Sequence, residues 1–167
     1  DEFHITDKFN INPGLRYTFV NYDKEDYFRN QWDNTNEDAF IYSLGLFYKF
    51  SEDYRAYFSY SKGYKMPQIR IAFETNGDLD AETSNNYELG LRTTPVDWLE
   101  VELAAYILDF DHKIFREGGL LNNGGKALHQ GIEMSGAIYP IEGLKLYGSG
   151  AIQKATIEYG MYKGNRI

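Results

Sequence analysis

The stretch "NNGGKALHQGIE", residues 122–133, gathers side chains that could do chemistry. Its two glycines before a lysine could cradle a phosphate, and its histidine and glutamate could exchange protons or bind a metal ion. A phosphate-binding loop needs the pattern G-x-x-x-x-G-K-[ST]. Here Leu120 stands where the first glycine belongs, and Ala127 follows Lys126. The stretch is therefore not a phosphate loop of that kind.

Two carboxylates lie two residues apart in "WLEVELAAYIL", at Glu100 and Glu102. On one face of a strand they would be roughly 7 Å apart, which overlaps the spacing in inverting glycosidases. No nucleophile, base or further constellation accompanies them. We expect them to pair with cations such as Arg92 or Lys145, and we predict no catalytic residues and no enzyme activity.

The three histidines, His4, His112 and His129, are scattered without the spacing of a zinc site. The chain has no cysteines, which excludes disulfides and thiolate metal sites. We therefore predict no bound metal and no cofactor. A net charge of −8 also speaks against a nucleic-acid partner.

Polar and apolar residues alternate along most of the chain, as in strands with one face of each kind. In residues 99–107, for example, leucine, valine and isoleucine alternate with glutamate, alanine and tyrosine. The pattern predicts about seven strands, at 8–20, 40–50, 54–64, 86–95, 98–115, 126–139 and 143–158.

The connections between these strands alternate in length. Short polar turns are predicted at 51–53, 95–97 and 140–142, and long loops at 21–38, 65–85 and 116–125. Aromatic residues flank both kinds of connection, and no apolar run is long enough for a transmembrane helix. Short turns at one rim, long loops at the other and aromatic girdles are typical of outer-membrane barrels. The alternative is a soluble β-sandwich that binds sugars through its aromatics.

Seven strands are too few to close a barrel around a lumen, so two edges would remain unpaired. The sequence therefore predicts an all-β, antiparallel transmembrane segment of a larger barrel. We expect the isolated chain to self-associate through its free strand edges. The polar faces would point to the lumen or a plug, with Glu88, Arg92, Glu100, Glu102, His129, Glu133 and Lys145 on them.

Five stretches carry a family likeness: "TDKFNINPGLRYT" (6–18), "YFSYSKGYKMPQ" (57–68), "AETSNNYELGLR" (81–92), "NNGGKALHQGIE" (122–133) and "YKGNRI" (162–167). In this order they resemble the later part of the barrel of TonB-dependent outer-membrane transporters. Within that group they are most similar to the ferric citrate type. A passive porin or adhesin-type barrel is the alternative within membrane proteins.

The resemblance implies a barrel of about 22 strands whose lumen holds an N-terminal plug. Residues 1–167 would be a partial barrel domain, with the plug, its TonB-engaging segment and the terminal strands outside this sequence. It further implies a multi-pass protein of the Gram-negative outer membrane, in contact with its lipid. That protein would import a ferric chelate, a siderophore complex or ferric citrate, with energy from the TonB complex acting on the plug. Iron would be cargo carried by its chelator.

The opening stretch would then be the descent from an outer loop into a strand. We expect residues 122–125 to supply a turn with positive φ. Below it, Leu128, Ile132, Met134 and Ile138 would face lipid, while His129, Gly131, Glu133 and Ser135 would face the lumen. The alternation slips near Gln130, which leaves the register open there.

An anionic ferric chelate needs cations and hydrogen-bond donors, and Arg offers a planar fork for carboxylates. The loop residues that could supply them are Arg70, Arg116 and Lys65, with Gln68 and Tyr64 at the strand lip. Each could equally be an ordinary solvated residue.

Overall fold

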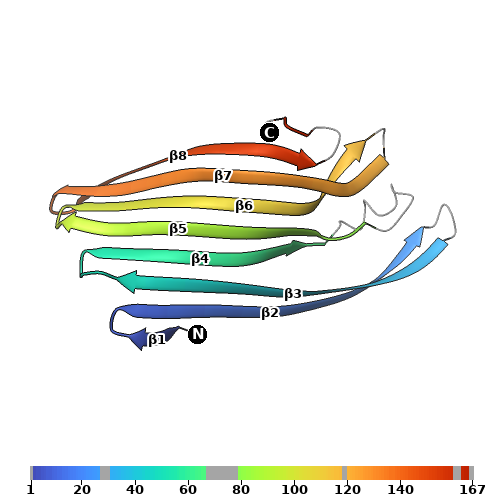
Figure 1. The fold of residues 1–167 in the computed structure, drawn as a ribbon, viewed down its shortest axis with the longest axis horizontal. Coiled ribbons are helices and arrows are strands. Elements are labelled where there is room, and N and C mark those ends of the chain that lie inside the picture. The colour runs from blue at the N-terminus through green and yellow to red at the C-terminus, as the bar shows by residue number, and fades with distance from the viewer. Residues whose placement is uncertain (1, 27–30, 67–78, 118–119, 160–162, 166–167) are drawn as a thin grey trace.

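The computed structural model describes residues 2–26, 31–66, 79–117, 120–159 and 163–165. They form one antiparallel sheet of 8 strands, each paired with its neighbours in sequence (Figure 1). The strands are β1 (Phe3–Thr6), β2 (Phe9–Asp26), β3 (Gln31–Lys49), β4 (Tyr54–Lys65), β5 (Glu82–Val96), β6 (Leu99–Glu117), β7 (Leu120–Ile141) and β8 (Leu144–Tyr159). In these residues no helix is long and apolar enough to cross a membrane. The all-β antiparallel prediction is confirmed.

All seven predicted strands exist, as β2 to β8, and the short β1 was not predicted. The short turns also lie where expected. The turns before β2, β4, β6 and β8 gather at one end of the sheet, the left end of Figure 1. The last of them contains Gly143 with a φ of 82°, a conformation that favours glycine.

Two of the three predicted long loops are wrong. Most of 21–38 is strand, because the β2–β3 ladder runs out to the pair Asp26–Gln31. Likewise the β6–β7 ladder reaches the pair Glu117–Leu120, inside the predicted loop 116–125. Both hairpins extend past β4 and β5 at the right end of Figure 1. These hairpin extensions have no apolar–polar alternation, yet their backbone groups still pair.

The predicted turn at 122–125 is also wrong, because these residues lie inside β7. Among the described residues, positive φ occurs at His112, Gly143 and Gly164, and not at Gly124 or Gly125. The chain bends there by bulges. The β6–β7 register shifts between Phe110 and Lys113 and again before Phe115.

The register near Gln130, which the sequence left open, is regular. Pairing of β7 with β8 runs without interruption from Ala127–Ile157 to Ile138–Leu146. Gln130 therefore shares a face with Ile132 and Met134, because alternate residues of a strand point the same way. The apparent slip is a polar residue on an apolar face.

The sheet has almost no buried core. Only Ala39, Ala104, Ala127 and Ala137 are buried among the apolar residues of the described chain. Large side chains stay open on one face, which we call the apolar face, including Leu89 at 61 % and Ile152 at 84 % exposure. A soluble sandwich would cover this face with a second sheet. The described residues form a single sheet, so the sandwich alternative is wrong.

Aromatic residues mark both ends of the apolar face. Near the short turns, Phe50, Tyr54 and Trp98 are exposed, and near the other end Phe19 and Tyr42 are exposed. Phe110, near the predicted loop 116–125, and Tyr139, near the predicted turn 140–142, were also expected in these girdles but lie on the other face. Phe110 packs edge-on against His129, and Tyr139 lies under the ammonium of Lys145.

Candidate functional site

The seven residues predicted to face the lumen lie on one side of the sheet, which we call the polar face. Cross-strand pairs share a face, and Arg92 pairs with Glu102 on β6. Alternation then places Glu88 and Glu100 on the same side. Ladder pairs with β6, or contact with it, place the remaining three residues on the same face: His129, Glu133 and Lys145. What these residues face in the whole protein stays a prediction.

Tyr57 of β4 joins three strands of the polar face. Its hydroxyl lies 2.7 Å from Oε1 of Glu88 and 3.1 Å from Oε1 of Glu102. The single hydroxyl hydrogen can serve one carboxylate at a time. Arg92 supplies the other donor, with its Nε 2.9 Å from Glu102 Oε1 and its guanidinium 5.0 Å from the centre of the Tyr57 ring. We call Tyr57, Glu88, Arg92 and Glu102 the tyrosine network.

A glycine makes this network possible. Tyr57 pairs across the ladder with Gly90, and a Cβ on Gly90 would lie 2.2 Å from Tyr57 Cζ. The ring therefore lies flat over the glycine and reaches the next strand. The same arrangement recurs where Tyr106 pairs with Gly131 and its hydroxyl lies 3.0 Å from Oε1 of Gln153. Twice on this face, a tyrosine crosses a glycine to link three strands.

A hollow of about 390 Å³ lies on the polar face near the short turns. The network residues Arg92 and Glu102 line it, together with Glu100 and Lys145, whose Nζ lies 3.8 Å from Glu100 Oε2. Glu52, in the turn at its rim, is 2.5 Å from Lys49 Nζ. The hydrogen bond from Lys49 holds the pKa of Glu52 below its usual range. Charges of both signs are fixed here, so the surface suits ion pairing and hydrogen bonding.

At the opposite end, two of the predicted ligand-binding residues are engaged with carboxylates. Tyr64 donates from its hydroxyl to Glu37 Oε2 at 3.3 Å, and Lys65 Nζ lies 2.9 Å from Glu82 Oε2. Gln68 and Arg70 lie outside the described residues. Arg116 is in β6, where its backbone pairs with Leu121. The structure therefore brings Tyr64 and Lys65 to the same strand end.

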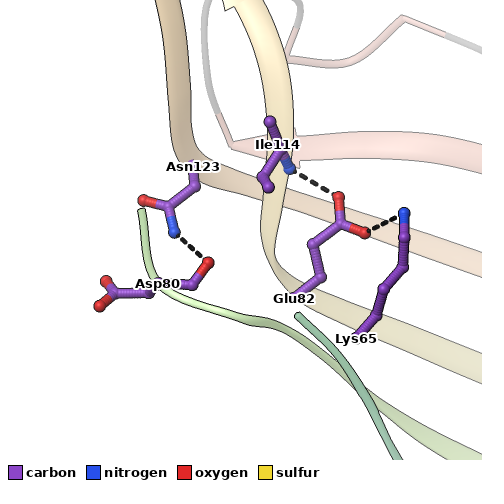
Figure 2. Close-up of polar contacts among 5 residues, drawn as sticks. All are labelled: Lys65, Asp80, Glu82, Ile114 and Asn123. Carbon is purple, nitrogen blue, oxygen red and sulfur yellow. Dashed lines mark hydrogen bonds and ion pairs between the residues drawn. The ribbon is translucent and has the colours of Figure 1, made fainter. Parts of the chain in front are cut away.

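Glu82 connects three strands at this end, as Figure 2 shows. Besides Lys65 of β4, it accepts the backbone N–H of Ile114 on β6 at 2.8 Å. This bond follows a bulge at His112, whose φ is 56°. In the same region, Nδ2 of Asn123 donates to the backbone carbonyl of Asp80 at 2.7 Å. We call Lys65, Asp80, Glu82, Ile114 and Asn123 the clasp, because they tie β4 and β5 to the β6–β7 hairpin.

The clasp sets the charge of Glu82, which lies at the tip of β5, beyond the apolar band that begins near Tyr87. Burial alone would raise the pKa of this carboxyl group. The hydrogen bond from Ile114 and the ion pair with Lys65 outweigh it, so the pKa of Glu82 lies below its usual range. Glu82 is therefore charged at neutral pH and holds both donors.

Sequence reasoning missed Tyr57, Tyr106 and Glu82. No local motif marks them, because their partners are distant in sequence and follow only from the strand register. Lys126, the lysine of the rejected phosphate loop, forms an ion pair, with its Nζ 2.6 Å from Asp111 Oδ1. In the described part of the chain, no group of three or more acidic or histidine side chains could hold a metal ion.

The chain was compared with known proteins. It matches a protein family described as "TonB dependent receptor-like, beta-barrel" over residues 1–167. The pesticin receptor of Yersinia pestis is 27 % identical over 182 residues, covering 99 % of this chain and 27 % of the receptor. An uncharacterized TonB-dependent receptor of Haemophilus influenzae is 29 % identical over 93 residues, covering 53 % of this chain and 27 % of its own. The chain thus spans 27 % of the length of these curated relatives.

Solved structures share the fold. The ferric yersiniabactin uptake receptor FyuA of Yersinia pestis superposes with a TM-score of 0.76 at 24 % identity, covering 99 % of this chain and 27 % of that one. The ferric citrate transporter FecA gives 0.78 at 20 % identity, with 95 % and 26 % covered. The copper transporter OprC gives 0.80 at 11 % identity, with 99 % and 28 % covered. The match over the whole chain, on a sheet with one apolar and one polar face, shows that this chain belongs to the TonB-dependent receptor β-barrel family of the outer membrane.

Proposed function

We propose that this chain is part of the barrel wall of an active transporter that imports a ferric chelate with energy from TonB. The family match along all 167 residues is the observation that carries the proposal. The relatives named above include receptors for a ferric siderophore and for ferric citrate. Members of such a family are transporters and receptors, so we assign the chain a binding and transport role without catalysis.

The apolar face would lie against the lipid of the outer membrane. A strand needs about 9–11 tilted residues to cross a bilayer, and β2 to β8 are all longer than that. The short turns would lie in the periplasm and the extended hairpins outside the cell. In this orientation the exposed Trp98 and Phe50 lie at the inner interface and Phe19 at the outer one.

The whole protein would continue on both sides of this sheet. β1 and β8 form the edges of the described sheet, and strand edges in a membrane need partners because lipid offers no hydrogen bonds. We infer further strands that close the barrel, to about 22 in all, and a plug in its lumen. The isolated chain, lacking these partners, is expected to associate through β1 and β8.

The polar face would hold the plug. In the tyrosine network the side chains hold one another, so they present oriented carboxylates and a guanidinium group. The residues that we propose to face the lumen are Glu88, Arg92, Glu100, Glu102, Glu133 and Lys145, with His129 above them. TonB would act on the plug, and this wall would guide its movement.

The ligand would bind at the end that carries the clasp. An anionic ferric chelate requires cations on a chain whose net charge is −8. Arg70 and Arg116 are the residues we propose for this contact, with Gln68 donating a hydrogen bond. Lys65 and Tyr64 would contribute to ligand binding indirectly. Their contacts with the carboxylates of Glu82 and Glu37 would hold the strand end in position. Ferric citrate stays one candidate among ferric chelates.

Uptake by the full-length protein tests this proposal. The protein is expressed in a strain without other iron receptors, and entry of radiolabelled ferric citrate or a ferric siderophore is measured with tonB intact or deleted. We expect saturable uptake of at least one chelate, only when TonB is present. Uptake that persists without TonB would indicate the passive porin alternative.

Two variants localise the binding step. Replacing Arg70 and Arg116 together by Ala should weaken chelate binding, because two charge-assisted contacts are lost. Lys62→Ala is the matched control, since Lys62 lies on the apolar face over the ring of Tyr42. Equal effects of both changes would contradict the assignment of the two arginines.

A second candidate function follows from the relatives. The pesticin receptors are 27–28 % identical over 99 % of this chain, so the outer hairpins could also receive a protein toxin. Killing assays with pesticin on cells that carry the full-length protein would test it. Survival of these cells at toxin levels that kill cells with the Yersinia pestis receptor would exclude pesticin itself.

A further inference from the structure

Three cations lie side by side on the polar face, close to the short turns. In the ladder, Lys49 of β3 stands directly opposite Arg55 of β4, and Arg55 stands directly opposite Arg92 of β5. We call these three residues the cation row. Their strands lie in the interior of the sheet, with β2 and β6 on either side (Figure 1). The neighbours of the row within the sheet are therefore all part of this sequence.

The two outer cations of the row have acidic partners, and the middle one has none. Lys49 Nζ lies 2.5 Å from Oε1 of Glu52, and Arg92 Nε lies 2.9 Å from Oε1 of Glu102. Arg55 is exposed and makes no hydrogen bond or ion pair with any residue that the structure describes. The pKa of Glu52 is lowered chiefly by its hydrogen bond to Lys49, and Arg55 adds only a charge effect from a distance. The row thus carries one unbalanced positive charge, at Arg55, in a chain whose net charge is −8.

The side chain of Arg55 is accessible from the polar side of the sheet. A hollow of about 360 Å³ on this face is lined by the whole cation row and by Tyr57. The other charged residues that line it belong to the segment 2–8: Glu2, Asp7 and Lys8. Arg55 and Arg92 also line the hollow near the short turns that was described above. A group that enters the lumen can therefore reach Arg55 from two sides.

Electrostatics requires a permanent partner for Arg55 once the lumen is filled. Like charges directly opposite in a ladder destabilise a sheet. A guanidinium group that loses its water without gaining a partner costs much more. A plug in the lumen would remove that water, whereas an anionic chelate would be present only in transit. A carboxylate fits the site, because a planar guanidinium group offers it two parallel N–H donors.

We propose that Arg55 binds an Asp or Glu side chain of the plug at the inner mouth of the barrel. Lys49 and Arg92 flank this carboxylate from the neighbouring strands, each about 5 Å away along the ladder, and add to the attraction. The inference rests on the proposed function, since it needs a plug in the lumen. It adds the place and the chemistry of one contact: an acidic plug segment at the short-turn end, opposite to the end that carries the clasp.

A zero-length cross-link tests this contact in the full-length protein, purified in mild detergent. Arg55→Lys places an ammonium group at the site, and a water-soluble carbodiimide joins it as an amide to a carboxylate in contact with it. We expect mass spectrometry to find the introduced lysine joined to an Asp or Glu of the plug. Lys65 and Glu82, 2.9 Å apart, are the positive control, and Lys62 on the apolar face should give no link to the plug.

The opposite result is equally clear. If the introduced lysine links only to carboxylates of the barrel, such as Glu52 or Glu102, the site is overturned. It is also overturned if no link forms there while the link between Lys65 and Glu82 does. Heat-dependent gel migration must show that each variant is a folded barrel.

Arg55→Gln gives a second measurement that needs no cross-link. The change removes the charge, so amide hydrogen exchange in the acidic plug segment should become about tenfold faster. Arg16→Gln is the matched control, because Arg16 is an arginine of the same face nearer the other end, where it pairs with Ile41. Unchanged exchange throughout the plug in Arg55→Gln would contradict the site. Uptake by the wild type tests the transport proposal separately, so TonB-dependent uptake without this contact would remove the contact alone.

Discussion

The two faces of this sheet are built from the same strands and differ in what their side chains contact. On the polar face, side chains contact each other across strands, as Tyr57 does with Glu88 and Glu102. On the apolar face, residues such as Leu15 and Ile152 are 76 % and 84 % exposed. Specific hydrogen bonds order the side chains of the polar face. The side chains of the apolar face are exposed and require a surrounding apolar phase to cover them.

This difference separates two sources of stability. Burial on the apolar face requires lipid, since the described chain buries only four alanines among its apolar residues. The side chains of the polar face are ordered by hydrogen bonds, and the strand register determines which of them lie opposite one another. Substitutions on the apolar face should therefore act through the membrane, and those on the polar face through individual partners.

A charge on the apolar face should have the largest effect. Leu103 points outward from the centre of the alternating stretch 99–107 of β6, between Leu91 and Met134 on the neighbouring strands. Leu103→Arg in the full-length protein should destabilise the folded barrel by about 2–4 kcal/mol, because arginine is costly near the bilayer midplane. Urea titration in lipid vesicles, read by heat-dependent gel migration, measures this free energy.

The control for this prediction is Ser149→Arg, on the polar face of β8 opposite Ser135. It should change the free energy of unfolding much less. Comparable losses for the two variants would show that the two faces do not differ in environment.

The next effect is steric and lies on the polar face. Gly90→Val places side-chain atoms where Tyr57 lies, since even a Cβ would be 2.2 Å from Tyr57 Cζ. The ring must move and release Glu88 and Glu102, at a cost of about 2 kcal/mol. Gly148→Val on the apolar face meets nothing and should be nearly neutral. If Gly148→Val costs as much, backbone propensity and not the tyrosine network explains the loss.

Removing one hydroxyl group from either face should have a smaller effect. Tyr57→Phe deletes the donor to two carboxylates and should cost about 1.5 kcal/mol. Tyr17→Phe, at a tyrosine that is 65 % exposed on the apolar face, should change the free energy of unfolding little. The same urea titration measures both, and an unchanged free energy of unfolding in Tyr57→Phe would show that the tyrosine network does not stabilise the fold.

The smallest effect concerns the clasp and depends on pH. The folded-state pKa of Glu82 lies below its usual range, so its contribution is present above the unfolded-state value of about 4.3 and is lost as pH falls through the folded value. We expect the Ile114 amide to exchange faster with solvent as the pH falls below the usual pKa range of a glutamate, after correction for intrinsic exchange. The ion pair is largely exposed at Lys65, so the effect should be about 0.5 kcal/mol.

Glu82→Gln is the comparison for that experiment. Its amide oxygen still accepts the Ile114 N–H, but its charge no longer titrates. The pH dependence of exchange at Ile114 should therefore flatten. An unchanged pH profile in Glu82→Gln would assign the dependence to another group.

The sequence alone predicted the part of each strand that has an apolar environment on one side and a polar one on the other. Residues 99–107 alternate because one side meets lipid and the other does not, and this period identified β6 and its face. Beyond the apolar band, the β2–β3 and β6–β7 extensions would lie outside the bilayer in the proposed orientation, so neither side of the strand needs to be apolar. The alternation then vanishes although the ladder continues, and for this reason 21–38 and 116–125 were wrongly predicted as loops.

The candidate site divides in the same way. Face assignments such as that of Glu133 needed only the period of two, so they could be derived from the sequence. The contacts of Tyr57 and Glu82 depend on which residues lie opposite one another, and Gly90 under the Tyr57 ring is unremarkable until the register is known. Bulges at His112 and beyond also shift the pairing, and no local pattern revealed them.

The most direct test of the two-faced sheet is a cysteine scan along β6 in the full-length protein in native membranes. The 167 residues contain no cysteine, so each position from Val101 to Leu108 can carry a single spin label once any cysteine elsewhere in the full-length protein is replaced. Collision with oxygen, which concentrates in lipid, should be high at Val101, Leu103, Ala105 and Ile107 and low at the residues between them. A flat profile, or one with the opposite phase, would contradict the assignment of the apolar face to the membrane.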